Sequence, residues 1–348
     1  MLPYFVALAI PSVLSLAPEL ASRLRWTVLG SALLIAFIGL RYDVGADWFG
    51  YDIIHSHLAD QDLAYALTRP EALSYLVFWL SVQATGDMIA SNLVAATVLI
   101  GGTLRMCRTT PNAWLAAVAV TPYLLIVFGM SGLRQSLAVG IILWALADWA
   151  KLKLHWRLAF VAAATLCHTS AMITLIFVVV DLETSRFRKS AAGLVTVLAA
   201  VFATRTATLS SALDLYQARY FGAPGGVVSE GSLFHIALLA GPAVLALAFW
   251  SRYRAELAST RLLGIGIIGT FSLFALNVLS STIASRLTLY FYFLPILVFG
   301  TFPRVIARQE HAGVALAVIG FHFAELATWL LFANNSWTYL PYQTIFER

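Results

Sequence analysis

The chain has 348 residues, of which 60% are hydrophobic and only 11% are charged, and its mean hydropathy is +0.83. Soluble proteins carry about 25% charged residues, so this composition excludes a soluble domain of any size. The net charge of +5 comes from Lys and Arg residues between apolar runs, as in membrane proteins, rather than from a basic nucleic-acid-binding surface. We therefore expect an all-α polytopic membrane protein, a single integral membrane domain over residues 1–348, with no nucleic-acid partner.

Basic side chains set the expected direction of each crossing. A helix over about residues 3–16 precedes Arg23 and Arg25, which the positive-inside rule places in the cytoplasm, and this puts the N-terminus outside. Further apolar runs predict helices over residues 26–40, 72–84, 88–103, 112–128, 134–148, 158–180, 191–203, 233–250, 262–280, 286–303 and 313–332. Together they predict about ten transmembrane helices plus short interfacial or re-entrant helices. The expected external segments are residues 41–71 and 204–232 and a tail over residues 333–348.

Two of the apolar runs depart from simple crossings. The run over residues 72–84 has about 13 residues, whereas a helical crossing needs about 20, so an interfacial or re-entrant helix is expected there. The run over residues 158–180 has basic clusters on both sides, at residues 151–157 and 186–189. The positive-inside rule places both clusters in the cytoplasm, but the two ends of a single crossing lie on opposite sides of the membrane. We favour a broken pair of helices that turns near His168, with one basic cluster on the outer side as the alternative.

Three arginines, Arg41, Arg134 and Arg286, lie at expected outer helix ends, against the prevailing charge bias. A guanidinium presents a planar fork of donors that matches phosphate oxygens, so three of them at one level could hold a diphosphate and stabilise it as a leaving group. His168 joins them if its helix breaks. Each arginine has a simpler alternative, because a basic side chain at a helix end also reaches lipid headgroups, and Arg41 could pair with a neighbouring Asp.

Carboxylates in the segment over residues 41–71 offer complementary chemistry, since a carboxylate can accept the proton of an attacking hydroxyl. The candidates are Asp47, Asp52 and Glu71, with a solvated surface as the alternative for any single Asp. His55 and His57 have no third ligand at a suitable spacing, and the two cysteines have no CxxC spacing. No metal site and no cofactor are therefore expected.

The chain resembles the EpsG family of Wzy-like bacterial polysaccharide polymerases in several blocks that follow the family's order. The blocks are RYDVGADWFGY with Arg41, Gly45, Asp47 and Tyr51, then Arg134 and Gln135 with Ala138, then HTSA from His168 to Ala171, then Arg286 with Tyr290, and finally Trp337 with Leu340, Pro341 and Tyr342. The middle part, from GLRQSLA to CHTSA, is the most specific. Three positions depart from the family pattern: Trp48 stands for Tyr, Cys167 stands for Phe, and Glu71 is followed by Ala-Leu instead of Pro-Gly.

The resemblance implies an inner-membrane enzyme with a fold like that of the GT-C glycosyltransferases and an active site facing the periplasm or exterior. Such enzymes transfer a growing glycan from undecaprenyl diphosphate to a sugar hydroxyl of another lipid-linked repeat unit. The resemblance also implies that no nucleotide sugar, metal or cofactor is used. The implied partners are the undecaprenyl-diphosphate-linked oligosaccharide and membrane lipid, and a chain-length regulator is a further candidate.

Under this interpretation Arg134 and Arg286, with Arg41 as a third candidate, bind the diphosphate. Asp47 is the preferred base and His168 a phosphate or acceptor contact, although either of the two could activate the acceptor hydroxyl. The expected catalytic residues are therefore Asp47, His168 and Arg134. The expected substrate-binding residues are Arg41, Arg286, Gln135, Tyr51, Trp48, Glu71, Trp337 and Tyr342. Trp48, Tyr51 and Trp337, together with Tyr339, are expected to stack on sugar faces or to anchor at the membrane interface.

Two other functions remain open. A GT-C enzyme that adds one sugar from a polyprenyl monophosphate would use a carboxylate pair in its first outer loop, which Asp43 and Asp47 could form. A flippase or other transporter of lipid-linked sugars would need polar residues on many helices around a central cavity, whereas most spans here are uninterrupted apolar runs.

Overall fold

The computed structural model describes residues 1–181, 231–257, 260–307 and 311–347 of the chain. The helix expected over residues 191–203, and nearly all of the external segment expected over residues 204–232, lie outside these described residues. Regular structure in the described part is helical, apart from an isolated β-bridge between Arg41 and Thr344.

The expected all-helical architecture is confirmed for this part of the chain. Its first half contains α1 (Leu2–Leu16), α2 (Pro18–Ala21), α3 (Leu24–Gly39), α4 (Trp48–Ala59), α5 (Leu63–Leu67), α6 (Ala72–Thr85), α7 (Ile89–Cys107), α8 (Ala113–Val120), the π-helix η1 (Thr121–Phe128), α9 (Leu133–Leu146), η2 (Trp149–Lys151), α10 (Leu154–Cys167), η3 (Thr169–Thr174) and α11 (Leu175–Asp181). The second half contains α14 (Ser232–Ala248), α15 (Trp250–Glu256), α16 (Thr260–Leu279), α17 (Ser281–Thr288), η5 (Leu289–Phe291), α18 (Phe293–Ile306), α19 (His311–Phe332), η6 (Ser336–Tyr339) and η7 (Ile345–Glu347).

Among the described helices, α7, α16 and α19 are long and apolar enough to cross a membrane. The bent pairs α14 with α15 and α17 with α18 raise the number of candidate spans to as many as five. The other apolar helices have 10–17 residues. A 14-residue helix such as α9 covers about 21 Å, which is less than the roughly 30 Å of a bilayer's hydrocarbon core. The fold is thus that of a helical membrane protein with three to five candidate spans, and the count of ten stays a prediction.

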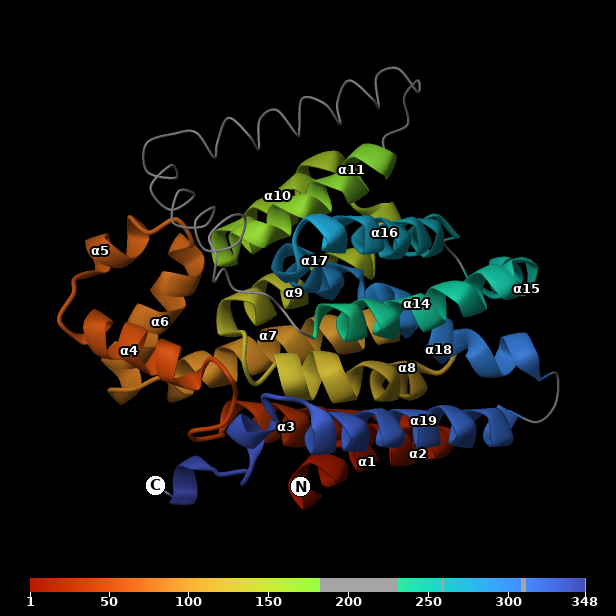
Figure 1. The fold of residues 1–348 in the computed structure, drawn as a ribbon, viewed down its shortest axis with the longest axis horizontal. Helices are drawn as coiled ribbons and strands as arrows, with labels where there is room; N and C mark the ends of the chain where they lie inside the picture. The colour runs from red at the N-terminus through yellow and green to blue at the C-terminus, as the bar shows by residue number, and fades with distance from the viewer. Residues whose placement is uncertain (182–230, 258–259, 308–310, 348) are drawn as a thin grey trace.

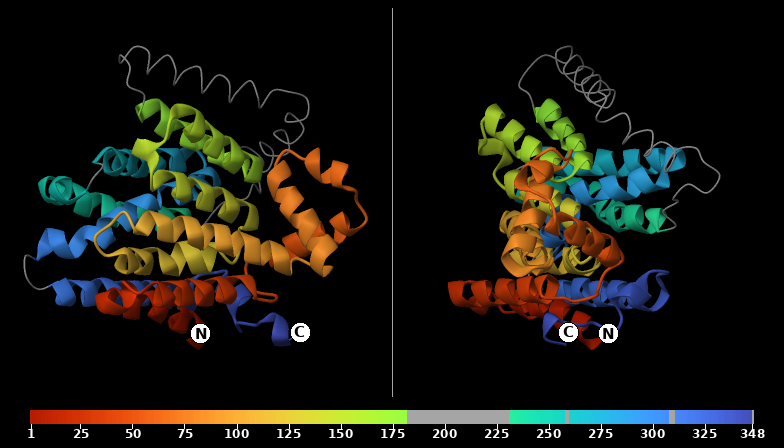
Figure 2. Two further views of the ribbon diagram at one scale, coloured as in Figure 1. Left: turned by 180° about the vertical axis from the view of Figure 1, so that it is seen from behind. Right: turned by 90° about the vertical axis from the view of Figure 1, so that its left-hand side faces the viewer.

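The helices lie side by side in stacked layers (Figures 1 and 2). Helices α1, α3 and α19 form one outer layer, α10 and α11 lie at the opposite face, and α7, α8, α9 and α18 lie between them. Gly102 of α7 and Gly140 of α9 let two of these helices touch at the backbone, because a Cβ on Gly102 would lie 2.0 Å from the carbonyl oxygen of Gly140. This close contact fixes α9, whose first turn carries Arg134.

The apolar run that contains His168 forms a helical hairpin, as the two flanking basic clusters predict. Helix α10 ends at Cys167, His168 has an extended backbone, and the chain continues through η3 into α11. Nη1 of Arg157, near the start of α10, lies 2.5 Å from Oδ2 of Asp181 at the end of α11, so both ends of the hairpin are at the same level. His168 is therefore at the tip of the hairpin and this ion pair is at its base.

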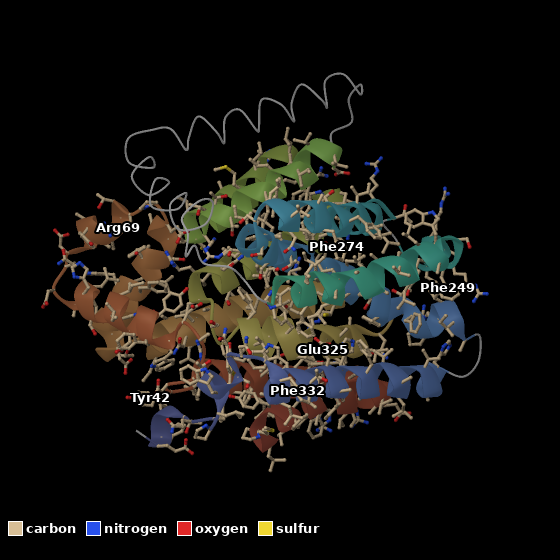
Figure 3. All side chains as sticks on the ribbon, in the orientation of Figure 1. Tyr42, Arg69, Phe249, Phe274, Glu325 and Phe332 are labelled. Atoms are coloured by element: carbon tan, nitrogen blue, oxygen red, sulfur yellow. The ribbon has the colours of Figure 1, made fainter. Side chains whose placement is uncertain are left out.

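The two ends of the helix bundle differ in composition. Helices α4 and α5 and the tail after α19 lie at one end, which we call the site end, and Figure 3 labels Tyr42 and Arg69 there. Because it contains α4 and α5, the segment over residues 41–71, expected as an external loop, is largely helical. Helix α15 lies at the opposite end, near the labelled Phe249, and we call this the basic end. Basic residues that the positive-inside rule places in the cytoplasm lie at this end. They line a cleft and are Arg105, Arg108, Lys151, Arg157 and Arg261.

Candidate active site

The loop between α3 and α4 is held in place by the C-terminal tail. The backbone N–H of Tyr42 donates to the carbonyl oxygen of Gln343 at 3.0 Å, and that of Gly45 donates to the carbonyl oxygen of Thr338 at 2.9 Å. Two segments from opposite ends of the sequence thus share backbone hydrogen bonds. This pairing fixes the position of Asp47, which follows in the same loop.

Gly45 brings this loop against the turn that precedes α9. Its φ of +117° is strained for residues with a side chain, and a Cβ there would lie 2.2 Å from the carbonyl oxygen of Met130. The close approach puts Asp47 beside Ser131, whose hydroxyl donates to Oδ2 of Asp47 at 2.9 Å and accepts from the Asp47 backbone N–H at 3.2 Å. Asp47 is exposed, and Ser131 precedes Arg134 by three residues.

Glu71 joins three separate segments through its carboxylate. Oε2 accepts from Nη1 of Arg134 at 2.6 Å, while Oε1 accepts from the backbone N–H of Thr169 at 2.9 Å and from its hydroxyl at 3.2 Å. Only 9% of the Glu71 side chain is exposed, against 31% for Arg134. Nε of Arg134 is buried and has no hydrogen-bond partner among the described residues. The ion pair therefore holds Nη1, while about a third of the Arg134 side chain stays exposed.

His168 is oriented by hydrogen bonds to one of its ring nitrogens. Nδ1 accepts from the backbone N–H of Ser170 at 3.2 Å and lies 2.7 Å from its hydroxyl, which is 2.9 Å from the hydroxyl of Tyr290. A ring nitrogen that accepts from a backbone amide carries no proton, so the imidazole is neutral with its proton on Nε2. The 4.0 Å between Nδ1 and Oε1 of Glu71 is too long for a hydrogen bond and does not alter this assignment.

Gln135 links this group to Arg286. Its side-chain amide donates to the carbonyl oxygen of Arg286 at 2.8 Å and lies 3.4 Å from the hydroxyl of Ser170. Arg286 is in α17, four residues before Tyr290. Gln135 is buried, so it positions the α17 backbone against α9 rather than facing the surface.

Arg286 also lines a cleft of about 730 Å³ at the site end. The lining includes Ala46 and Ser131, the chain neighbour and the hydrogen-bond partner of Asp47, so Asp47 lies next to the cleft. Phe332, one of the lining residues, is labelled in Figure 3 near the end of α19. The aromatic lining residues are Tyr123, Phe128, Phe234, Trp329, Phe332 and Tyr339, and the polar ones include His235, Ser285, Asn334 and Asn335. Aromatic faces with a few polar groups suit a sugar, whose ring faces are apolar and whose edges carry hydroxyls.

The model of the EpsG family matches residues 25–344, which is nearly the whole chain. The chain belongs to the EpsG family. This confirms the resemblance drawn from the sequence blocks. No curated protein and no solved structure matches the chain. The residues described above, from Asp47 to Arg286, all lie inside the matched segment of this EpsG protein.

Several residues expected at the substrate lie together in the EpsG protein and others lie apart. The structure brings together Asp47, Tyr51, Glu71, Arg134, Gln135, His168 and Arg286 around the start of α9. The hydroxyl of Tyr51 accepts from the backbone N–H of Arg134 at 3.4 Å. Trp337 is 73% exposed, and Tyr342 stacks on Phe37, to whose carbonyl oxygen its hydroxyl donates at 2.7 Å. Both lie outside the described lining of the cleft.

Arg41 is buried in this EpsG protein and bonds to the backbone of its own turn, so its expected contact with the substrate stays a prediction. Its side chain is buried, Nη1 donates to the carbonyl oxygen of Ile38 at 2.6 Å, and Nε donates to that of Val44 at 3.0 Å. Trp48 lies 5.7 Å from its guanidinium. Burial lowers the pKa of Arg41 to about 10, so the group stays charged at neutral pH. With these two donors turned to backbone carbonyl oxygens, Arg41 closes the turn before α4.

Sequence reasoning missed four residues that build the site, namely Ser131, Thr169, Ser170 and Tyr290. Three of them stand in the quoted sequence blocks, so the signal was present but their role was not assigned. Their role depends on contacts between residues far apart in the sequence, such as Ser170 with Tyr290. Among the cleft aromatics, Tyr339 was expected to stack on a sugar or anchor at the interface, whereas Trp329 and the others were missed. An aromatic residue in an apolar helix looks the same in sequence whether it faces lipid or a cleft.

Proposed function

We propose that this protein is a polysaccharide polymerase that transfers a growing glycan from undecaprenyl diphosphate to a sugar hydroxyl of another lipid-linked repeat unit, on the outer face of the inner membrane. Membership of the EpsG family supports a polymerase-like function. The observation that carries the proposal is the convergence of Glu71, Arg134 and His168 from three chain segments, next to the cleft lined by Arg286.

Arg134 and Arg286 bind the diphosphate in this proposal. Glu71 occupies Nη1 of Arg134 and holds the guanidinium in one orientation, while the exposed part of the side chain, 31% of it, contacts phosphate oxygens. Fixed positive charge stabilises the diphosphate as it leaves, and its effect is largest where water is excluded.

His168 donates a hydrogen bond through Nε2 in this proposal. Its Nδ1 is occupied by Ser170, which leaves the protonated nitrogen for a phosphate oxygen or a substrate hydroxyl. A neutral histidine with this tautomer is a donor and not a base at Nε2. The phosphate-contact role expected for His168 is therefore preferred to the role of general base.

Asp47 is the base that activates the acceptor. It is exposed next to the cleft, and Ser131 holds one of its carboxylate oxygens. The acceptor hydroxyl attacks the anomeric carbon of the glycan, forms the new C–O bond and gives its proton to Asp47. The bond between that carbon and the phosphate oxygen breaks, and the diphosphate leaves with the bonding electrons. The aromatic cleft residues, such as Trp329, bind the sugar rings during this transfer.

A reconstituted assay with synthetic lipid-diphosphate repeat units tests this proposal. The wild-type protein should make a ladder of chain lengths, whereas Arg134→Ala and Arg286→Lys should leave single repeat units with normal membrane insertion. Arg304→Lys is a matched control, because Arg304 pairs with Glu256 at 3.7 Å at the basic end, away from the site. Long chains from both site variants would overturn the diphosphate assignment. Addition of a single sugar by the wild type would indicate a monophosphate-dependent GT-C enzyme, and translocation without a glycosidic bond would indicate a transporter.

A further inference from the structure

A second cleft, of about 1130 Å³, lies at the basic end, opposite the candidate active site. It is bounded by the end of α7, the connection from α9 to α10, the end of α11 and the start of α16. Its charged lining residues are Arg105, Arg108, Asp148, Lys151, Arg157, Asp181 and Arg261. The proposed transfer reaction uses none of these residues.

Positive charge exceeds negative charge in this lining. Asp148 accepts from Arg105 and lies 3.6 Å from Nζ of Lys151. Asp181 pairs with Arg157 at 2.5 Å and with Arg261 at 3.0 Å. The two carboxylates are thus each shared by two cations, and an excess of three positive charges remains among the described lining residues. Arg108 is exposed and has no ion pair in the described part of the chain.

Two lining residues also carry unpaired donors. Nε of Arg105 and Nε1 of Trp149 are buried and have no hydrogen-bond partner among the described residues. Trp149 itself is only 4% exposed. A buried donor without a partner is unfavourable, and an oxygen-rich anion in the cleft supplies acceptors for such groups.

Most of the remaining lining residues are apolar. They include Leu146, Leu152, Leu154, Leu262, Ile265 and Leu297. The positive-inside rule explains basic residues in cytoplasmic loops, but it does not require them to line a cavity together with leucines. A ligand that matches both kinds of lining residue has an anionic head and a hydrocarbon chain. Basic pockets of this kind between helices bind the headgroups of anionic lipids.

We infer that the basic-end cleft binds the phosphate headgroup of an anionic lipid. The headgroup contacts Arg105, Arg108 and Lys151, and the hydrocarbon chain lies against the leucines of α9 and α16. The cleft adjoins the base of the α10–α11 hairpin, where Arg157 meets Asp181, so a bound lipid also packs against the hairpin that carries His168. This inference does not depend on the proposed polymerase reaction.

Native mass spectrometry of the full chain in detergent tests the inference with three lipids of similar chain length: phosphatidylglycerol, phosphatidylcholine and a polyprenyl monophosphate. At least one of the two anionic lipids should bind about tenfold more tightly than phosphatidylcholine. Arg108→Gln and Lys151→Gln should each weaken that binding about fivefold, the typical effect of one basic side chain at an anionic lipid. Arg254→Gln is the matched control, because Arg254 is exposed near the same end but lies outside the described lining.

The outcomes are distinguishable. Preference for phosphatidylglycerol identifies a phospholipid site, and preference for the polyprenyl monophosphate identifies a carrier-lipid site. Equal binding of all three lipids would overturn the inference. It would also be overturned if Arg108→Gln and Lys151→Gln bound the anionic lipid as tightly as the Arg254→Gln control does. Displacement of the bound lipid by millimolar inorganic phosphate would show a site for soluble phosphate and would also overturn the lipid assignment.

Discussion

The ion pair between Glu71 and Arg134 gives the sharpest test of the proposed site. We predict that Glu71 acts only through Arg134, as a positioning residue that does not touch the substrate. Glu71→Gln keeps the size of the side chain but removes its charge, and it places an N–H₂ group near one of three donors: Arg134 Nη1 at 2.6 Å, Thr169 N–H at 2.9 Å or the Thr169 hydroxyl at 3.2 Å. The guanidinium then loses its fixed orientation.

The size of the effect follows from these contacts. A hydrogen bond to a charged group contributes about 1.5–3 kcal/mol, so loss of the Glu71–Arg134 bond should slow polymerisation by about 10–10²-fold. Arg134→Gln removes the charge that stabilises the leaving diphosphate, which should cost about 10²–10³-fold, as for other preorganised donors. Because both changes disable the same guanidinium, the double variant should be no slower than Arg134→Gln alone.

The measurement is the rate of chain growth from lipid-diphosphate repeat units by each single variant and by the double variant. Glu256→Gln serves as the control, since Glu256 pairs with Arg304 at the basic end and its loss should leave the rate within about twofold. A double variant that loses the product of the two single effects would refute the reasoning. Such additivity would mean that Glu71 contributes on its own, for example as the base.

Three further predictions concern other residues. His168→Gln should keep more than about a tenth of the rate, because its amide can replace the Nε2 donor, whereas His168→Glu should be inactive. Asp47→Asn should slow chain growth at saturating substrate by about 10²–10⁴-fold. Substrate binding should not weaken, so the loss should persist at saturating substrate. Arg41→Met should destabilise the protein by about 2–4 kcal/mol in thermal unfolding, because two buried carbonyl oxygens lose their donor. Unchanged stability with lost activity would instead put Arg41 in the chemistry.

Much of the helical framework could be predicted from the sequence. Apolar runs between basic clusters placed most helices within a few residues of their observed ends, since hydrocarbon length and charge act locally along the chain. The turn at His168 was also predicted, because basic clusters flank both sides of its apolar run. Helix α4 was missed within a segment rich in Asp, although Tyr51, His55 and Leu58 form its buried face at helical spacing.

The individual roles of the arginines could not be predicted in the same way. Arg41 and Arg134 look alike in sequence, since each stands at the outer end of an apolar run. Their difference arises from tertiary packing: Arg41 bonds to carbonyl oxygens of its own turn, whereas Arg134 meets Glu71, which is 63 residues away in the chain. Pattern and propensity do not encode such long-range pairs, and a single sequence offers no covariation that reveals them.

The pairing of the loop before α4 with the tail after α19 has a consequence for biosynthesis. Asp47 leaves the ribosome early, but the residues whose carbonyl oxygens bond to its loop, Thr338 and Gln343, are translated only after nearly all the helices. A nascent chain can therefore insert into the bilayer and pack its helices before the loop of Asp47 gains these two backbone bonds. The order of synthesis thus makes the arrangement of this loop one of the last parts of the fold to be completed.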